Sequence, residues 1–270
     1  ILMTTHSPQI LARFTDGKIV RLTKDASLQT TRALSCSTEA DTVLDKFGYR
    51  LNSITSEVFF SRGVLLVEGP SEVMLYTALS SALGIDLDRL NLSIISVEGV
   101  GFKKYLDVCI SLEVPFVVRT DNDVFRTSKK DGGTHYRYAG VTRAVGLLEN
   151  ILGDSIPEEV ESILTQFKPD LTWEGEHPAE HNTKAAMQLK TLAEKYGIHL
   201  ALKDLENDLA IGPLRDQLAE YYDKQNVEEI VEQMQTRKAE SMYNFLKEGP
   251  DLTPLIRNFV TAPLRALADK

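Results

Sequence analysis

The sequence predicts an α/β protein whose mostly parallel sheet is flanked by helices. Short apolar runs, rich in β-branched and aliphatic residues, alternate with longer segments whose apolar residues recur at helical spacing. The apolar runs are 64–67, 92–97, 115–120 and 198–202. Strands that alternate with helices are typical of parallel sheets, because each crossover needs room for a helix. The carboxyl ends of such strands meet at one edge of the sheet, and ligands bind there.

Two acidic residues follow the first apolar run. Residues 64–67 are typical of a short buried strand, so Glu68 lies at its carboxyl end. Apolar residues at helical spacing over 75–83 predict a helix that places Glu72 in its first turn. Two carboxylates four residues apart at a strand-to-helix junction suit metal or proton chemistry. On this segment alone the alternative has equal weight: Glu72 complements the helix dipole, and Glu68 is a solvated turn residue.

A second acidic motif follows the third run. Residues 115–120 lead directly into Asp121, Asn122 and Asp123. Carboxylates at alternate positions of an extended segment point the same way and can share a divalent cation. A metal-free turn held by the Asp and Asn side chains is the alternative. One strand and one helix separate this motif from Glu68, so a βαβ arrangement would bring both motifs to one sheet edge.

Composition limits the class of protein. The chain has 270 residues, a net charge of −9, 43% hydrophobic and 26% charged residues, as in ordinary globular proteins. No apolar run reaches membrane-spanning length, and no segment resembles a signal peptide. Cys36 and Cys109 provide neither a disulfide framework nor a cysteine zinc site, which fits a cytoplasmic protein. The first residue is Ile1, so we expect a fragment of a longer protein.

The N-terminal segment is predicted to begin with a strand, 1–5, that ends in His6-Ser7-Pro8. This order resembles the switch-histidine segment near the end of ABC-type ATPase domains, although a surface loop is the alternative. No GxxxxGK[ST] phosphate loop occurs in the chain, so His6 cannot support ATP hydrolysis by itself. Residues 17–22 alternate like a half-exposed strand, and the polar stretch 23–41 is interpreted as a loop or linker.

The acidic motifs together resemble a known domain. Val67-Glu68-Gly69-Pro70-Ser71-Glu72, a turn containing Gly99, and Asp121-Asn122-Asp123 resemble the Toprim domain of topoisomerases, primases and certain nucleases. The spelling VEGxxE behind Phe59-Phe60, with Thr-His-Ser-Pro upstream, resembles the OLD (overcoming lysogenization defect) family. The resemblance implies a Rossmann-like sheet with helices on both faces, metal-dependent cleavage of DNA, a partner ATPase domain and a bacterial cytoplasmic setting, such as phage defence. It also implies residues 1–55 as an ATPase tail with linker, and 56–270 as the Toprim domain with a helical insertion at about 131–197.

A third acidic cluster follows the run 198–202. The OLD-like motif LExDLE is matched here by Asp204 and Glu206, but Leu202 stands where its first Glu would be, and Asp208 is the residue that could compensate. Farther along, Lys238 falls on the continuation of an apolar helical stripe, where a charge is costly unless it is paired or functional. By resemblance it is the candidate that neutralises charge on the scissile phosphate. A lysine whose stem reaches outward to solvent is the alternative.

Residues 126–140 are predicted to form a polar, basic, glycine-rich loop that could hold a DNA backbone. A solvated loop is the alternative. Two amphipathic helices follow, over 160–167 and 185–196. His177 and His181 have helical spacing but lie in a Pro- and Glu-rich segment, so zinc binding is not expected there.

The resulting hypothesis is hydrolysis of DNA phosphodiesters with two divalent cations, Mg²⁺ or Mn²⁺. Glu68 with Asp121 or Asp123 would hold one cation, and Glu72 with Asp204, and with Glu206 or Asp208, the other. Three alternatives remain: a non-nucleolytic Toprim module such as a primase or recombination mediator, a phosphohydrolase with Asp121 as nucleophile, and a regulatory or dimerisation module. The phosphohydrolase is disfavoured because its acidic motif usually follows the first core strand, which Asp121 does not. Among the non-nucleolytic Toprim modules, a strand-passage enzyme would also need a nucleophilic tyrosine, and the sequence identifies none.

Overall fold

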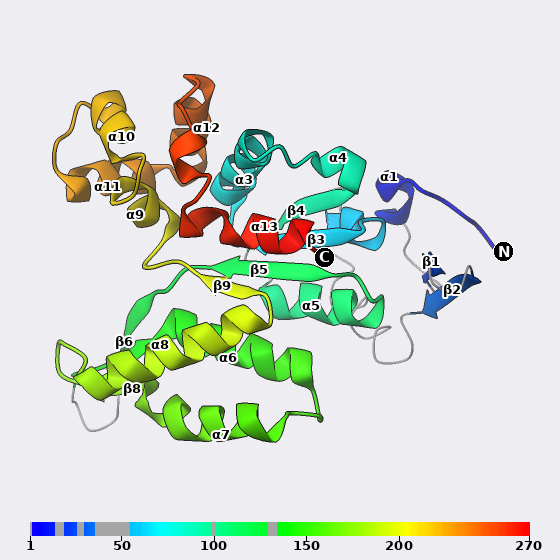
Figure 1. The fold of residues 1–270 in the computed structure, drawn as a ribbon, viewed down its shortest axis with the longest axis horizontal. Coiled ribbons are helices and arrows are strands. Elements are labelled where there is room, and N and C mark those ends of the chain that lie inside the picture. Colours follow the sequence, from blue (N-terminus) through cyan, green and yellow to red (C-terminus); the bar gives the residue numbers. More distant parts are fainter. Residues whose placement is uncertain (1, 14–18, 26–29, 36–54, 99–100, 129–133) are drawn as a thin grey trace.

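The computed structural model describes residues 2–13, 19–25, 30–35, 55–98, 101–128 and 134–270 (Figure 1). Its centre is a four-stranded parallel sheet in the order β4-β3-β5-β9. The strands are β3 (Gly63–Val67), β4 (Leu92–Ser96), β5 (Phe116–Thr120) and β9 (Ile198–Leu200). These are the four apolar runs, so the predicted α/β class and parallel sheet are confirmed.

Two hydrophobic cores cover the two faces of this sheet. Because successive side chains of a strand point to opposite faces, Val64 and Leu66 of β3 enter one core and Leu65 and Val67 the other. All four side chains are fully buried. A run that is apolar at every position is the expected pattern of a strand covered on both faces.

Helices of one half of the chain cover the first face. They are α5 (Phe102–Ser111), α6 (Ala139–Leu152), α7 (Glu158–Phe167) and α8 (Glu180–Lys195). The helices α5, α6 and α8 lie below the sheet in Figure 1, and α7 packs against α8 farther out. The helices predicted over 160–167 and 185–196 are α7 and α8.

The second face carries α3 and the C-terminal helices. They are α3 (Pro70–Ala82), α9 (Leu205–Ala210), α10 (Arg215–Tyr222), α11 (Val227–Thr236), α12 (Lys238–Lys247) and α13 (Ala262–Ala268). Short helices α4 (Leu87–Leu90), η2 (Thr55–Phe59), η3 (Lys168–Leu171), η4 (Thr253–Leu255) and η5 (Phe259–Thr261) join these elements. No helix in the described part of the chain combines the length and apolarity needed to cross a membrane.

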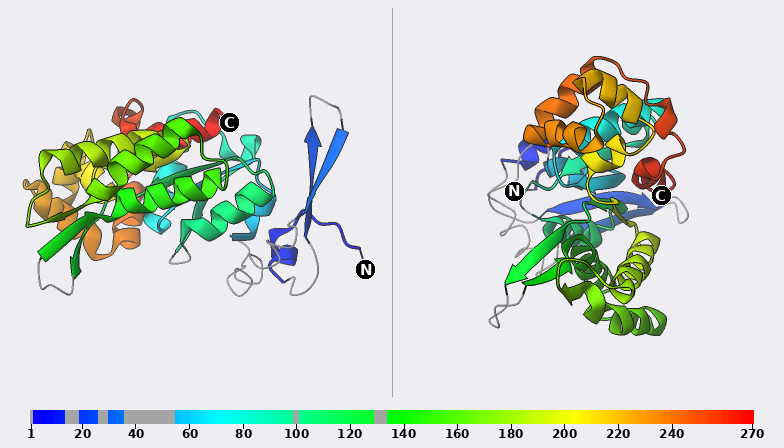
Figure 2. Two further views of the ribbon diagram at one scale, coloured as in Figure 1. Left: turned by 90° about the horizontal axis from the view of Figure 1, so that it is seen from below. Right: turned by 90° about the vertical axis from the view of Figure 1, so that its left-hand side faces the viewer.

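A second, antiparallel sheet replaces the loop predicted over 126–140. It contains β6 (Val124–Ser128), β7 (Thr134–Tyr138) and β8 (Thr172–Glu174), in the order β6-β7-β8 (Figure 2). The loop prediction was wrong for 126–128 and 134–138, because β-branched and aromatic residues favour strands, and the partner strand β8 is distant in sequence. Tyr136 stacks on Trp173 of β8 with ring centroids 5.9 Å apart. Lys129 and Lys130, like Gly99, lie outside the described residues.

The N-terminal segment also differs from its prediction. A strand was predicted over 1–5, but residues 2–7 form no strand, and no described strand pairs with them. The helix α1 (Pro8–Leu11) follows, with Ser7 as its N-cap. The strands β1 (Val20–Asp25) and β2 (Thr30–Ser35) form a two-stranded antiparallel ribbon. Part of the stretch 23–41, interpreted as a loop or linker, is therefore strand. The two strands form because each satisfies the backbone hydrogen-bonding groups of the other. Residues 36–41 lie outside the described ranges.

Candidate functional site

Glu68 and Asp121 lie side by side at the carboxyl edge of the sheet. Because β3 and β5 are adjacent and parallel, the residues that follow them meet. Oε1 of Glu68 accepts hydrogen bonds from the Thr120 hydroxyl at 2.6 Å and from the Asp121 backbone N–H at 2.9 Å. Burial tends to raise the pKa of Glu68, but Thr120, Arg143 and the Asp121 amide outweigh it and hold that pKa below its usual value. The structure thus brings the first two acidic motifs together.

Glu72 is buried in the first turn of α3. Its Oε2 accepts a hydrogen bond from the Gly69 backbone N–H at 3.0 Å and from the Ser71 hydroxyl at 3.2 Å. A carboxylate that accepts from the N-cap amide satisfies a free donor of the helix and complements its dipole. Burial is the main cause that raises the pKa of Glu72, against the opposing effect of Arg119. The helix-capping role is therefore realised, and Oε1 remains directed into the site.

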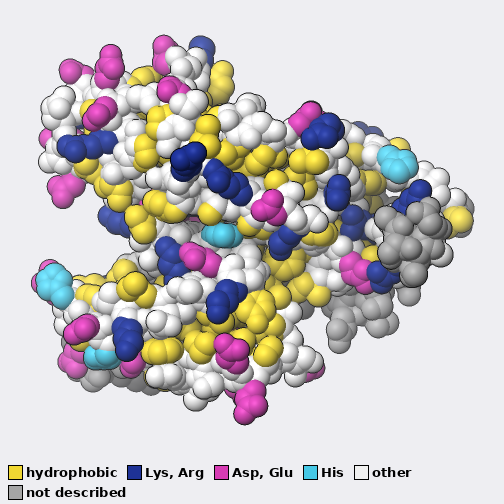
Figure 3. Space-filling view, in the orientation of Figure 1, with side chains coloured by type: hydrophobic (Ala, Val, Ile, Leu, Met, Phe, Trp, Pro, Cys, Tyr) yellow, Lys and Arg dark blue, Asp and Glu magenta, His cyan; other side chains and the backbone are white. Residues whose placement is uncertain are grey.

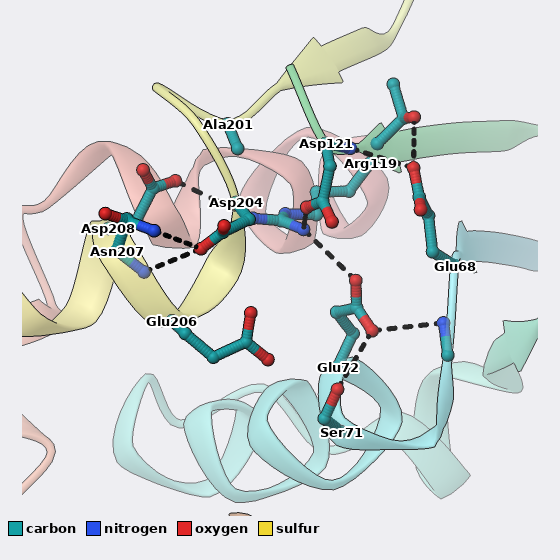
Figure 4. Close-up of polar contacts among 12 residues, drawn as sticks. Glu68, Ser71, Glu72, Arg119, Asp121, Ala201, Asp204, Glu206, Asn207 and Asp208 are labelled. Carbon is teal, nitrogen blue, oxygen red and sulfur yellow. Dashed lines mark hydrogen bonds and ion pairs between the residues drawn. The ribbon is translucent and has the colours of Figure 1, made fainter. Parts of the chain in front are cut away.

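Arg119 joins the carboxylates, and sequence reasoning did not select it. Its Nη1 lies 3.1 Å from Oε1 of Glu72 and 2.7 Å from Oδ1 of Asp121, and its Nη2 lies 3.6 Å from Oδ2 of Asp208 (Figure 4). The side chain is 3% exposed. Burial tends to lower the pKa of Arg119, but the neighbouring acidic groups outweigh it and hold that pKa above its usual value. The available signal was a charged residue inside an otherwise apolar strand, which is costly unless it is paired.

Asp121 shows the electrostatic consequence of this crowding. Burial is the main cause that raises its pKa, to about 7, and the negative charges of Glu68 and Glu72 act in the same direction. Arg119 and Lys238 oppose the rise. Several carboxylates thus converge on a buried position with less positive charge than they need.

Arg143 of α6 is the second residue that the sequence did not indicate. Its Nη1 contacts Glu68 and the Thr120 hydroxyl, and its Nη2 lies 3.2 Å from Oδ2 of Asp123. The start of α6 is held against this turn, because the backbone N–H of Gly140 donates to the Asp123 carbonyl at 3.2 Å. A Cβ at position 140 would lie 2.3 Å from the Asp121 carbonyl oxygen, so this close approach requires glycine.

The third acidic cluster lies on α9, and its members have different surroundings. Asp204 is the N-cap of α9: its Oδ1 accepts from the Asn207 backbone N–H at 2.8 Å, and its Oδ2 accepts from Gln235 at 2.9 Å. Glu206 is buried and extends from α9 toward Glu72 (Figure 4). The carboxylate of Asp208 accepts from the backbone N–H of Leu202 at 3.0 Å.

Lys238 reaches this cluster by a different route from the one predicted. The helix with the apolar stripe ends after Thr236, Arg237 has φ −145° and ψ 68°, and Lys238 is the first residue of α12. Its Nζ donates to Oε2 of Glu206 at 3.0 Å. Burial tends to lower the pKa of Lys238, but Glu206 and, more weakly, Asp121 and Asp204 raise it above its usual value. The lysine is paired at the site, so the outward-reaching alternative does not describe it.

The donor set suits hard divalent cations. Carboxylate oxygens are the ligands that Mg²⁺ and Mn²⁺ prefer, and seven acidic side chains here contact or adjoin three basic ones, Arg119, Arg143 and Lys238. Among the described residues, no three Asp, Glu, His or Cys side chains are already arranged around one ion position. The two guanidinium groups lie between the carboxylates, so cation binding would require side chains to rotate away from them.

The three histidines considered in the sequence analysis lie on other segments than the acidic residues. His6 is exposed just before α1, and His177 and His181 are exposed near the start of α8. The site is thus built from β3, β5, α3, α6, α9 and α12 and opens toward a notch between two groups of elements. Figure 3 shows this notch between α9–α12 above and α8 with the small sheet below.

Comparisons with known proteins agree with this arrangement. A family model described as "Overcoming lysogenization defect protein-like, TOPRIM domain" matches residues 59–123. Endonuclease GajA of Bacillus cereus (strain VD045) is 28% identical over 222 residues, which are 78% of this chain and 36% of that protein. OLD nuclease of Thermus scotoductus (strain ATCC 700910 / SA-01) is 30% identical over 131 residues, 46% of this chain and 25% of that protein. The chain thus spans about a third or less of these relatives.

A solved structure supports the fold. The C-terminal region of the Burkholderia pseudomallei OLD protein superposes with a TM-score of 0.55 at 20% identity, covering 78% of this chain and 98% of that one. At this identity the likeness concerns the fold alone. The chain therefore contains an OLD-like Toprim domain and is homologous to Endonuclease GajA and OLD nuclease.

Proposed function

We propose that this chain hydrolyses DNA phosphodiester bonds with two divalent cations, Mg²⁺ or Mn²⁺. The observation that carries the proposal is the convergence of three acidic motifs, from separate parts of the sequence, on one edge of the parallel sheet. The printed names of the two homologous relatives, an endonuclease and a nuclease, support the same reaction class. A buried group of carboxylates that exceeds its positive partners is the environment in which a divalent cation is most strongly stabilised.

The proposed ligands fall into two groups. Glu68 and Asp123 are linked through Arg143, which supports a first cation held by Glu68 with Asp121 or Asp123. Glu72 faces α9, which supports a second cation held by Glu72 with Asp204 or Glu206. Asp208 fits least well in this group. Its carboxylate accepts from the Leu202 backbone and faces Arg119, so we propose that it positions Arg119 instead.

The protein groups have separable tasks in this reaction. Two bound cations supply an activated water and charge stabilisation for the leaving oxygen. Lys238 is placed by Glu206 to neutralise charge that develops on the phosphate. Arg119 opposes the rise in the pKa of Glu72 and Asp121, Arg143 lowers the pKa of Glu68, and both guanidinium groups direct the carboxylates.

The small sheet is the proposed DNA contact beside the site. β6 begins directly after Asp123, and Phe125 and Arg137 form an opposed pair of exposed residues on β6 and β7. An exposed aromatic side chain beside a cation can stack on a base while the cation contacts the phosphate. This proposal keeps the DNA-binding role predicted for residues 126–140 but assigns it to the paired strands β6 and β7.

The wider context rests on the family resemblance. We propose that residues 1–55 are the tail and linker of an ABC-type ATPase domain, that 56–270 form the Toprim nuclease domain, and that 131–197 are its insertion. The proposed setting is the bacterial cytoplasm, with a role in phage defence and with oligomers formed through the ATPase part. The ribbon of β1 and β2 contacts the Toprim part through Arg21, which donates to the carbonyl oxygens of Ser61 and Leu112.

The test is cleavage of supercoiled plasmid by the purified chain with Mg²⁺, Mn²⁺ or EDTA. We expect nicking or linearisation with a divalent cation and none with EDTA. Glu72→Gln and Asp121→Asn keep the shape of the side chains and should abolish cleavage, whereas Asp154→Asn, at an exposed position, should cleave like wild type. Absence of cleavage with every cation, or full activity of both site variants, would leave a non-nucleolytic or regulatory module as the better reading.

A further inference from the structure

A cavity of about 430 Å³ lies along β9 and shares Arg119 and Asp208 with the acidic edge. β9 is the end strand of the sheet order, and the cavity is bounded by α8 on one side and by the segment from η5 to α13 on the other. Tyr76, Asp208 and Arg119 are its most deeply buried polar members, and Lys190 and Glu194 are its contribution from α8. The volume is within the range of ligand pockets.

Two buried nitrogen atoms of this cavity lack hydrogen-bond partners among the described residues. They are Nη2 of Arg119 and Nε2 of His199. The nearest acid, Asp208, lies 3.6 Å from Nη2, beyond hydrogen-bonding distance, and its carboxylate is occupied by the Leu202 backbone N–H. A buried polar group without a hydrogen-bond partner is unfavourable, so a ligand that supplies a partner to both atoms would be stabilised here.

A third donor lies nearby with little to hold it. The Nζ of Lys190 donates a long hydrogen bond to the Ala201 carbonyl, at 3.5 Å, and its charge also acts on Asp208 of the same cavity. Burial, followed by the positive charges of Lys270 and Lys190, lowers the pKa of His199 to about 4, so the ring is neutral in a positive environment. The cavity wall carries Arg119, Lys190 and the neutral His199 beside two carboxylates, Glu194 and Asp208, and Asp208 already faces Arg119.

We propose that this cavity binds a small anion through a phosphate group, with Arg119, Lys190 and His199 as its donors. Phosphate oxygens accept several hydrogen bonds at once and suit a guanidinium and an ammonium group together. The phosphate could belong to a free small molecule, such as a mononucleotide, or to a DNA strand; both provide the same recognised group.

Arg119 connects this cavity to the acidic edge. The same guanidinium that offers Nη2 to the cavity uses Nη1 to bind Glu72 and Asp121. An anion on Nη2 would draw Arg119 away from these carboxylates and leave them freer for cations. A phosphate bound in the cavity would therefore change the affinity of the acidic edge for divalent cations. By linkage, a cation bound at the acidic edge would change the affinity of the cavity for phosphate by the same factor.

The test measures binding of inorganic phosphate to the metal-free chain, by thermal shift and calorimetry, without DNA or chelator. We expect a saturable rise in Tm beyond that in chloride of equal ionic strength. Lys190→Gln and His199→Leu should each raise the phosphate Kd about tenfold or more. Lys195→Gln, an exposed lysine at the end of α8, is the matched control and should bind like wild type.

Competition then identifies the source of the phosphate. A 5′-mononucleotide that displaces phosphate, dependent on Lys190, assigns the cavity to a free small molecule; a short DNA duplex that does so assigns it to a strand. The proposal is overturned if wild type shows no saturable phosphate effect, or if Lys190→Gln and His199→Leu both fold and bind phosphate as tightly as wild type. Since no cleavage is measured, failure here is distinct from failure of the proposed nuclease activity.

Discussion

Nη1 of Arg119 lies 2.7 Å from Oδ1 of Asp121, and the two residues sit two positions apart at the end of the same strand. The same nitrogen lies 3.1 Å from Oε1 of Glu72, which comes from a different crossover. The buried guanidinium group of Arg119 therefore fixes the relative positions of two acidic motifs that belong to separate βα units. Its loss should affect both folding and cation binding.

Replacement of Arg119 should be strongly destabilising. In Arg119→Met the buried carboxylates of Glu72 and Asp121 lose their main positive partner, and we expect a loss of about 3–5 kcal/mol in the free energy of unfolding. Urea denaturation measures it. Mn²⁺ should raise the Tm of Arg119→Met more than that of wild type, because the cation replaces the missing charge. Equal stability of variant and wild type would contradict the role of Arg119.

Lys238 should matter more for rate than for binding. The side chain is 45% exposed, and its partner Glu206 is buried, so the ion pair directs the ammonium group to the site. Lys238→Met should lower the kcat of plasmid cleavage on the order of 10²-fold, and Lys238→Arg should recover part of it. Lys247→Met, an exposed lysine on the same helix, is the control. A change confined to KM would instead indicate that Lys238 binds DNA without stabilising the transition state.

The hairpin should contribute affinity that depends on salt. Arg137→Ala removes an exposed charge beside Phe125, and we expect weaker DNA binding together with a salt dependence of log K whose slope is smaller by about 1. Titration of a labelled oligonucleotide at several KCl concentrations measures it. Arg89→Ala, at the opposite end of the sheet before β4, should leave the slope unchanged. An unchanged slope in Arg137→Ala would remove the hairpin from the DNA path.

Cys109 should be inert to thiol reagents in the folded protein. It is fully buried in α5, and burial raises the pKa of its thiol to about 12, so little thiolate exists at pH 8. In a Cys36→Ser background, we expect Ellman's reagent to label Cys109 at the rate of unfolding, with rapid labelling in urea. Complete labelling of the native protein within seconds would show that α5 is not packed as described.

The acidic residues could be selected from the sequence because they follow apolar runs, and strand ends of parallel sheets coincide in space. Glu68 and Asp121 meet for that reason, through a hydrogen bond from the Asp121 amide. Arg119 and Arg143 were not selected. The direction of a side chain in a buried strand, and a contact between residues 75 apart such as Arg143 and Glu68, depend on packing that no local pattern contains.

The small sheet shows the same limit for secondary structure. Residues 126–140 were predicted to be a loop because they are polar, basic and rich in glycine, but Trp173 of β8 supplies an aromatic surface against which Tyr136 and Tyr138 pack. Likewise, the apolar stripe before Lys238 predicted a continuing helix, whereas the chain turns at Arg237. In the small sheet, a partner strand distant in sequence outweighed the local preference.

The sequence by itself determined the four core strands, the α/β class and the positions of the acidic motifs, because hydrophobic runs and the residues that end them act locally. Only the tertiary structure decided the strand order β4-β3-β5-β9, which guanidinium groups lie between the carboxylates, and the cavity along β9. The reason is physical: a buried charge is stable only beside partners that neutralise it, and those partners are brought together by long-range packing.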